Sequence, residues 1–263
     1  MQNRTIVITA ISLLTLASAP VFANQLCKDL PDHAALTAAL KQATAVGDSK
    51  ANGGLALNMW ATVVARDGSV CAVTFTGADW GEQWPGSRVI SAQKANTANA
   101  FSLPGLALST ANLFSAVQDG GSLFGLQLSN PVDPAVAYQG DAGQFGKPAD
   151  PLVSKRIGGI NVFGGGLSLY NAQGKLLGGL GVSGDTSCAD HNIAWKTRHA
   201  LKLDFVPTGV SKKDNNAKSD DNILYDIDQN GQSVSGFGHP DCELGEKEAA
   251  DKLPDTQAVA AKP

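Results

Sequence analysis

Apolar side chains recur at helical spacing in four stretches of the chain. In residues 31–45 they fall three or four positions apart, a proline stands at the start and Gly47 follows the end. This is the pattern of an amphipathic helix with ordinary start and stop signals. The same spacing predicts helices over residues 87–101, with Ser87 as the N-cap, from Pro104 to Val117, and over residues 187–205.

Short apolar and β-branched runs predict the strands. These runs are residues 57–65, 70–76, 124–128, 162–170 and 175–182. Asp67-Gly68 separates the first two runs and Gln173-Gly174 separates the last two. Because such dipeptides favour tight turns, both pairs are expected to be antiparallel hairpins.

The order of these elements predicts an α+β fold, with a mostly antiparallel sheet of about five strands and helices packed on it. Residues 129–157 are rich in Pro, Gly and Asp and show no periodicity, which is typical of a functional loop such as a lid. The composition changes again after Pro207. We therefore expect a main domain over residues 24–207 and, over residues 208–263, a polar linker, a short hairpin at Asn230-Gly231 and a charged tail.

The first 23 residues have the features of a signal peptide. Arg4 precedes an apolar stretch, and Val21-Phe22-Ala23 gives the small-x-small pattern of a cleavage site. No later stretch is long and apolar enough to predict a membrane span. We therefore expect an exported protein, periplasmic or secreted, that begins at Asn24 after processing.

Charge and cysteine content narrow the function classes. A formal net charge of -4 in 263 residues does not favour nucleic acid as a partner. The four cysteines suit an oxidising compartment, where two disulfides could form in three ways. We favour Cys188 with Cys242 and Cys27 with Cys71, because each end of the chain is then tied to a central element. A Cys-Cys-His metal site is the alternative, although no C-x-x-C or H-x-x-x-H spacing supports it.

Three motifs in fixed order resemble one known family. They are SAQKANTA at residues 91–98, FGGGL at residues 163–167, and GGLGVSG at residues 178–184 with Asp190 six residues later. The chain resembles the GlcG/HbpS-like family of haem-degrading or haem-binding domains over residues 31–205. The resemblance implies a profilin-like fold, homo-oligomers, and haem or a related tetrapyrrole as the ligand.

Histidine is scarce, so the candidate ligands of a haem iron are few. His191 is the preferred candidate because it lies in the first turn of the last helix, beside the glycine-rich hairpin; the alternative is an exposed first-turn residue. His33 and His239 are weaker candidates. His199 is expected on the surface, and eight residues of helix keep it from sharing one iron with His191.

Other candidate ligand-binding residues surround the same hairpin. Thr186 and Asp190 lie at the start of the last helix, where an anion could bind, although Asp190 with Ser187 as N-cap also resembles a capping box. Lys94 could pair with an acid of the ligand, or be solvated. The run Gly164-Gly165-Gly166 predicts either a bulge or a close approach of the backbone to a ligand or to a neighbouring subunit.

Three functions from different classes remain open at this stage. The first is an exported protein that binds haem or a related tetrapyrrole, with a part in haem or iron sensing or handling. The second is an enzyme that acts on a small organic acid or degrades haem, but neither a G-x-S-x-G motif nor a convincing catalytic triad is present. The third is an oligomeric interaction module without a ligand. We favour binding over catalysis.

Overall fold

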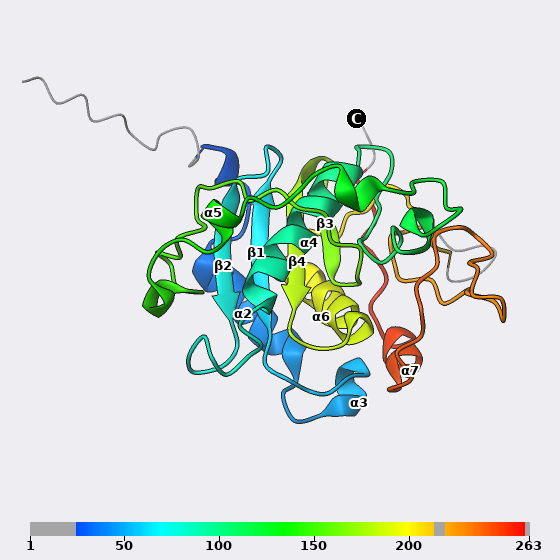
Figure 1. The fold of residues 1–263 in the computed structure, drawn as a ribbon, viewed down its shortest axis with the longest axis horizontal. Helices are drawn as coiled ribbons and strands as arrows, with labels where there is room; N and C mark the ends of the chain where they lie inside the picture. Colours follow the sequence, from blue (N-terminus) through cyan, green and yellow to red (C-terminus); the bar gives the residue numbers. More distant parts are fainter. Residues whose placement is uncertain (1–24, 213–218, 261–263) are drawn as a thin grey trace, which may run out of the picture.

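A four-stranded antiparallel sheet forms the centre of the molecule in the computed structural model, which describes residues 25–212 and 219–260 (Figure 1). The strand order is β2-β1-β4-β3. The strands are β1 (Trp60–Ala65), β2 (Val70–Phe75), β3 (Gly166–Tyr170) and β4 (Leu176–Ser183). The predicted α+β class is confirmed, with four strands instead of about five.

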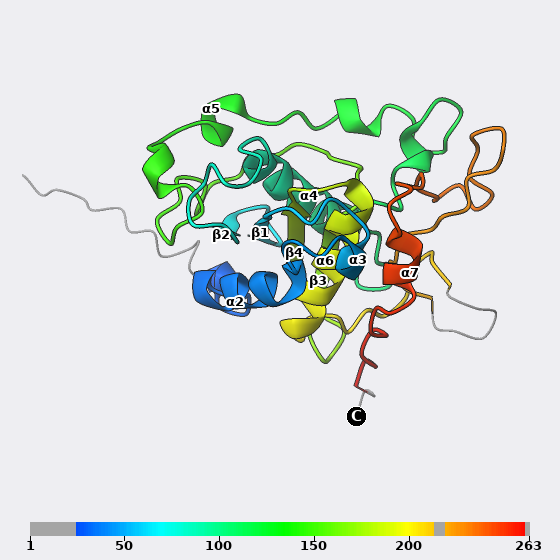
Figure 2. The ribbon, with the colours of Figure 1, turned by 90° about the horizontal axis from the view of Figure 1, so that it is seen from below.

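Helices cover both faces of this sheet. Helix α4 (Ser87–Phe101) lies on one face, and α2 (His33–Thr44) and α6 (Ser187–Ala200) lie on the other (Figure 2). Their apolar sides close two main cores, one on each face of the sheet. The short helices are α3 (Ser49–Asn52), α5 (Pro134–Ala137) and α7 (Glu246–Ala250), with 3-10 turns at Ser115–Val117, Leu126–Leu128 and Ala142–Gln144.

Glycines in β4 let α4 lie directly on the sheet. A Cβ atom at Gly181 would stand 1.9 Å from the carbonyl oxygen of Ser91, and one at Gly179 would stand 2.2 Å from that of Ala95. A residue with a side chain would not fit at such distances. The close packing of α4 therefore explains why this strand is rich in glycine, although glycine usually weakens a strand. The pattern GGLGVSG therefore sets the distance between α4 and the sheet.

Both hairpins form where the turn dipeptides predict them. Gly68 and Gly174 adopt φ values of +82° and +68°, which residues with a Cβ rarely adopt. Helix α2 also agrees with the prediction, and the side chain of Asp32 caps it by accepting a hydrogen bond from the amide of Ala35. Helix α4 spans the predicted residues, but Gly86 rather than Ser87 is its N-cap.

The helix predicted from Pro104 to Val117 is wrong. Turns replace it, and only Ser115–Val117 forms a short 3-10 helix. Polar side chains take the place of the helical bonds: Ser109 and Asn112 each accept a hydrogen bond from the backbone amide of the other. Such local side-chain bonds compete with a helix, and apolar spacing alone does not reveal them.

Two other elements differ from the prediction. The strand expected over residues 124–128 is absent; Gly125 has a φ of +85°, and Leu128 is 83% exposed. The last helix ends at Ala200, five residues early, because Lys202 adopts a left-handed conformation with a φ of +55°. In both places a residue with positive φ interrupts the backbone conformation that the apolar pattern predicts.

Residues 129–157 form a packed covering segment rather than an open loop. Ala137, Leu152 and Ile157 are buried against Trp60 and neighbouring residues of β1, β2 and α4. Arg88 of α4 donates to both carboxylate oxygens of Asp150 and to the carbonyl of Ala137. This segment therefore completes the core on the α4 face.

The chain beyond residue 207 also packs against the domain. The predicted hairpin around Asn230-Gly231 is reduced to a turn with a single bridge between Ile227 and Ser233. In the tail, the carbonyl of Pro254 accepts a hydrogen bond from the indole of Trp195 at 2.8 Å. The predicted signal peptide lies outside the described residues. Within those residues, no helix combines the length and the apolar character needed to cross a bilayer.

Candidate functional site

Lys94 and Asp190 meet in the interior, where the start of α6 approaches α4. Lys94 Nζ donates to Asp190 Oδ2 at 2.6 Å and to the carbonyl of Val182 at 3.2 Å. Both side chains are almost fully buried. The prediction of a solvated lysine is therefore wrong, because its partner lies 96 residues away in the sequence and only the fold brings the two together.

Asp190 does not cap its helix. Thr186 is the N-cap of α6 and accepts a hydrogen bond from the amide of Ala189 at 3.2 Å. Asp190 Oδ1 instead accepts from the amide of Asp185 at 2.9 Å. Burial raises the pKa of Asp190 to about 6, although the Lys94 ammonium opposes this shift. The predicted capping box at Ser187 is wrong, and the carboxylate belongs to a buried ion pair.

The glycine run 164–166 lies against the protein's own chain. A Cβ atom at Gly164 would stand 2.3 Å from the carbonyl oxygen of Ser187, and one at Gly165 would stand 2.5 Å from that of Val182. At Gly166 it would meet the side chain of Thr110 at 2.4 Å. The close approach that the sequence indicates is therefore to α6, β4 and the turn at Thr110.

His191 is completely buried rather than exposed at the start of its helix. Its Nε2 lies 3.2 Å from Asn222 Oδ1 and 3.2 Å from the backbone amide of Ile223. Among the described residues, Nδ1 has no hydrogen-bond partner. Burial, followed by the positive charge of Arg198, lowers the pKa of His191 to about 3, so the ring is neutral at pH 7.

His239 is the second buried imidazole of this region. Its Nδ1 lies 2.7 Å from the carbonyl oxygen of Pro240. Since a carbonyl can only accept, Nδ1 carries the proton and Nε2 has a free lone pair. Nε2 is buried and has no partner within the described chain. Burial lowers the pKa of His239 to about 4, despite the bond to Pro240.

The two rings belong to one cluster. His239 contributes to the lowered pKa of His191, and Lys94 contributes to that of His239, so all three groups interact. Phe114 and Trp195 lie beside the rings, with ring centroids 5.2 Å from His239 and 6.1 Å from His191. We call His191, His239, Lys94 and Asp190 the histidine cluster.

The other two histidines lie elsewhere. His33 Nε2 lies 2.8 Å from the carbonyl oxygen of Gly146, next to Phe75 on the β2 edge of the sheet. The histidine cluster lies towards the opposite edge, beside β3. His199 bonds to Asp204 at 2.7 Å, and 41% of its side chain is exposed, which agrees with its predicted surface position.

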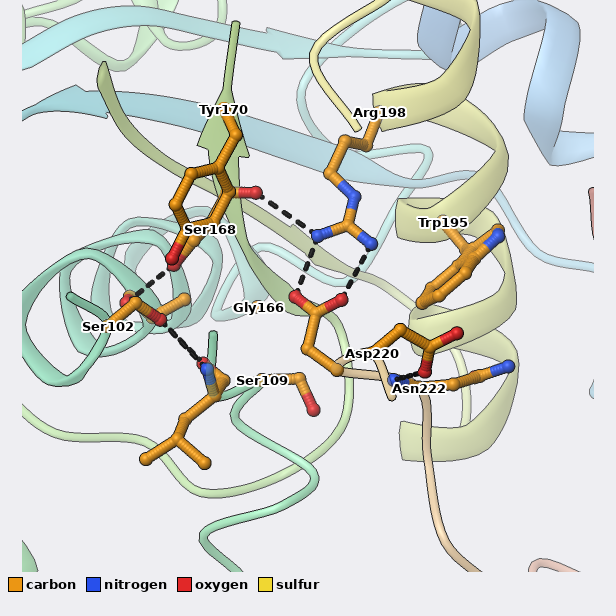
Figure 3. Close-up of polar contacts among 12 residues, drawn as sticks. Ser102, Ser109, Gly166, Ser168, Tyr170, Trp195, Arg198, Asp220 and Asn222 are labelled. Atoms are coloured by element: carbon orange, nitrogen blue, oxygen red, sulfur yellow. Dashed lines mark hydrogen bonds and ion pairs between the residues drawn. The ribbon is translucent and has the colours of Figure 1, made fainter. Parts of the chain in front are cut away.

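Residues 219–242, which we call the strap, begin and end at α6, and residues near both ends contact the histidine cluster. At one end, the Arg198 guanidinium binds both carboxylate oxygens of Asp221 at 2.7 and 2.8 Å, with no exposure of either side chain. Figure 3 shows this guanidinium directed at the strap between β3 and Trp195. At the other end, Cys242 forms a disulfide with Cys188. The strap is thus anchored to α6 on both sides of His191.

Both predicted disulfides, Cys188–Cys242 and Cys27–Cys71, are present. Cys188, Cys242 and Glu246 lie close together, but the two sulfur atoms are bonded to each other. The thiolates that a metal would need are therefore consumed. Glu246 is also occupied, because it accepts hydrogen bonds from the amides of Cys242, Glu243 and Leu244.

A cavity of about 360 Å³ lies beside the strap. Phe114, which contacts His239, and Phe237 of the strap both line it, together with Ser115, Gln118 and Gln232. Its lining joins aromatic rings with amide and hydroxyl groups.

The sequence did not indicate Arg198, Asp221 or Asn222 as part of this region. Residues 211–221 are polar and read as a solvated linker, whereas Asp221 is fully buried. One signal was available. His191, Trp195 and Arg198 recur at helical spacing, so a second face of α6 carries long polar and aromatic side chains that need a cover.

Solved structures of several proteins are similar to this chain. Klebsiella pneumoniae protein ORFY is 24% identical, with 72% of this chain and 97% of that chain covered and a TM-score of 0.42. The PduOC:haem complex gives 22% identity, coverage of 65% and 91%, and a TM-score of 0.43. A double mutant of Streptomyces reticuli HbpS gives 15%, 76% and 99%, and 0.40.

No curated protein matches the sequence. The family model described as haem degrading protein HbpS-like matches residues 34–198, from the start of α2 to Arg198 near the end of α6. This match covers more than half of the chain and includes the sheet, α4 and His191. The chain therefore belongs to the HbpS-like family.

Proposed function

We propose that this protein is an exported protein that binds haem or a related tetrapyrrole, with the histidine cluster as its binding region. One observation carries the proposal: two buried neutral imidazoles, each with a ring nitrogen that has no partner. An unsatisfied buried polar atom costs about 1–3 kcal/mol, so two in one cluster call for an explanation. Membership of the HbpS-like family supports the explanation that these nitrogens bind haem.

The donor chemistry of the cluster fits a haem iron. Imidazole nitrogen is a common axial ligand of haem, and it must be unprotonated to bind the metal. His191 can offer Nδ1 when its Nε2–H donates to Asn222 Oδ1. In the other tautomer Nε2 accepts from the amide of Ile223, and Nδ1 carries the proton. Asn222 therefore controls whether His191 can act as a ligand.

A tetrapyrrole can reach these nitrogens only if the strap moves. His191 is not exposed at all, and only 2% of the surface of His239 is accessible. Between its anchors the strap bonds to the domain near its two ends: Asn222 and Ile223 contact His191, the carbonyl of Asn222 accepts from Asn112, and that of Gly238 accepts from Ser115. Ligand binding thus involves opening of residues 222–241 over α6.

Two further parts of the proposal concern the cell and the assembly. We propose a periplasmic or secreted location, because two disulfides suit an oxidising compartment and the sequence predicts a signal peptide. We also propose that the protein forms homo-oligomers, as the family resemblance implies. We also propose a part in haem or iron sensing or handling, which requires binding of the ligand but no chemical reaction.

Titration of the purified mature protein with hemin tests the proposal. We expect a saturable shift of the Soret band at about one hemin per chain, because the described chain holds one such cluster. His191→Gln, which keeps a polar side chain of similar size, should weaken binding or change the Soret position. His199→Gln is the matched control on the same helix and should behave like the wild type.

Absorbance that rises without saturation would reject haem binding. Loss of the Soret band with release of iron under peroxide or a reductant would instead assign the protein to the haem-degrading enzymes. A normal circular dichroism spectrum and melting curve of His191→Gln would show that any loss of binding is not a loss of fold.

A further inference from the structure

The tautomer of His239 is fixed in a form that can bind a metal, whereas that of His191 is not. His239 lies outside the part of the chain that the family model matches. We infer that His239 is a metal ligand supplied by the strap, and that its Nε2 coordinates the metal of the bound tetrapyrrole. This inference rests on the proposed function and adds a second protein ligand to it.

The tautomer of His239 is fixed by its surroundings. The bond from Nδ1–H to the carbonyl of Pro240 leaves the lone pair on Nε2, whereas the tautomer of His191 depends on Asn222. Histidines that bind metals usually donate their other ring N–H to a carbonyl or carboxylate in this way. Coordination by Nε2 would therefore form one bond to the metal and release no proton.

The bonds that orient His239 lie within the strap itself. Its Nδ1 binds the carbonyl of Pro240, and its backbone amide donates to the carbonyl of Leu224 at 2.7 Å. Both partners belong to the strap, so the ring keeps its tautomer and direction when the strap moves away from α6. The donor is thus carried by the segment that must open.

The surroundings of His239 also suit a flat ligand. Phe114 lies beside its ring and lines the cavity of about 360 Å³, which Phe237 of the strap also lines. Aromatic side chains can stack on a porphyrin face. His239 itself does not line the cavity, but the ring of Phe114 links the two, so a stacking group lies beside the donor on the strap side of the cluster.

The first test needs no haem. In protein labelled with ¹⁵N-histidine at pH 7.5, long-range ¹H–¹⁵N spectra should show His239 with a protonated Nδ1 and an unprotonated Nε2. A protonated Nε2 would overturn the inference. Addition of hemin to the same sample should then broaden the ring signals of His239 through the paramagnetic iron and leave those of His199 sharp.

The second test compares His239→Ala with His199→Ala. We expect His239→Ala to bind hemin about tenfold more weakly or worse and to give a different Soret position and ferric EPR spectrum. Free imidazole should restore the wild-type spectrum, because it can replace the missing ligand. His199→Ala should show no change. If His239→Ala does not fold, His239→Gln, which keeps a polar side chain of similar size, takes its place in the same comparison.

The outcomes separate the two proposals. Wild-type protein that binds no hemin saturably would reject the proposed function. If the wild type binds hemin and His239→Ala retains its affinity and spectrum, only the inference fails. Weaker binding with an unchanged spectrum and no rescue by imidazole would also overturn it, since a merely structural residue would behave in that way.

Discussion

Two long segments with little regular structure cover different parts of this molecule, and their polar groups differ. In residues 129–157, Asp150 accepts from Arg88, Gly146 and Leu152, so this buried ion pair is fully bonded. In the strap, Asp221 is paired with Arg198, but His239 Nε2 and the hydroxyl of Tyr225 have no partner in the described chain, and neither does His191 Nδ1 below them.

Under the proposed function, this difference separates a structural cover from one that takes part in ligand binding. A fully bonded segment gains nothing from a ligand, and removing one of its partners leaves a charge without compensation. A segment that leaves buried imidazole nitrogens without a hydrogen bond lowers the stability of the fold, and a metal or a hydrogen-bond donor could offset this loss. The sequence predicts a functional loop for residues 129–157 and a polar linker with a short hairpin for the strap, and the pairing of their buried atoms is what distinguishes the two.

The largest effect is expected from breaking the ion pair of the first segment. Asp150→Ala should lower the free energy of unfolding by about 3–5 kcal/mol, because it leaves the Arg88 guanidinium buried and unpaired. Urea unfolding followed by circular dichroism measures this loss. Arg156→Ala is the control, since Arg156 pairs with Asp67 while 64% of its side chain is exposed; its loss should stay below about 1 kcal/mol.

The hemin affinity of Asp150→Ala tests the same comparison at the proposed ligand site. Under conditions where Asp150→Ala is still folded, it should bind hemin as the wild type does, because the segment lies at the other edge of the sheet. A change in the Soret spectrum of this variant would show that residues 129–157 take part in the ligand site, and the contrast between the two covers would fail.

The two disulfides allow a matched test of how the strap is held. Replacing Cys188 and Cys242 by serine should cost about 2–4 kcal/mol, and replacing Cys27 and Cys71 should cost a similar amount, because the closed loops are of similar length. Only the first change should increase hydrogen exchange in residues 222–241, since it frees one anchor of the strap. Equal exchange in both variants would mean that the disulfide does not hold the strap.

A smaller effect concerns pH. His191 has a pKa near 3 in the folded protein and about 6.5 when unfolded, so between these values the unfolded chain takes up a proton that the folded chain does not. The stability due to a neutral His191 is therefore complete above pH 6.5 and decreases as the pH falls. Between pH 7 and pH 5 this group should cost about 2 kcal/mol.

The comparison of wild type with His191→Gln isolates this contribution. The free energy of unfolding of the wild type should fall more steeply with acidification, while Asp190 and His239 contribute to both proteins alike. Arg156→Ala, which alters no histidine, should keep the wild-type slope. Parallel curves for wild type and His191→Gln would show that the ring is protonated as readily in the folded state as in the unfolded one.

Local signals in the sequence were sufficient for much of the fold. Asp67-Gly68 and Gln173-Gly174 fix the two hairpins because their backbone conformations are intrinsic to those residues. The spacing of apolar residues was sufficient for α2 and α4, whose buried faces are regular. It failed between Pro104 and Val117, where Ser109 and Asn112 bond to the backbone and replace helical bonds.

The candidate site was harder to predict because it depends on long-range pairs. Lys94 and Asp190, or Arg198 and Asp221, are ordinary charged residues in the sequence, and charged residues are usually solvated. Their burial depends on segments that come together only in the folded chain. His191 was correctly placed beside the glycine hairpin, but its burial follows from the strap, whose polar sequence gives no such indication.

The double anchorage of the strap has a kinetic consequence. Asp221 and Cys242 are both fixed to α6, at Arg198 and Cys188, which are about 15 Å apart along the helix. The chain between them could extend to about 70 Å, so it can lift without releasing either end. His239 would then act as a tethered ligand at an effective concentration in the millimolar range. A bound metal that loses His239 would recapture it faster than a free competitor could arrive.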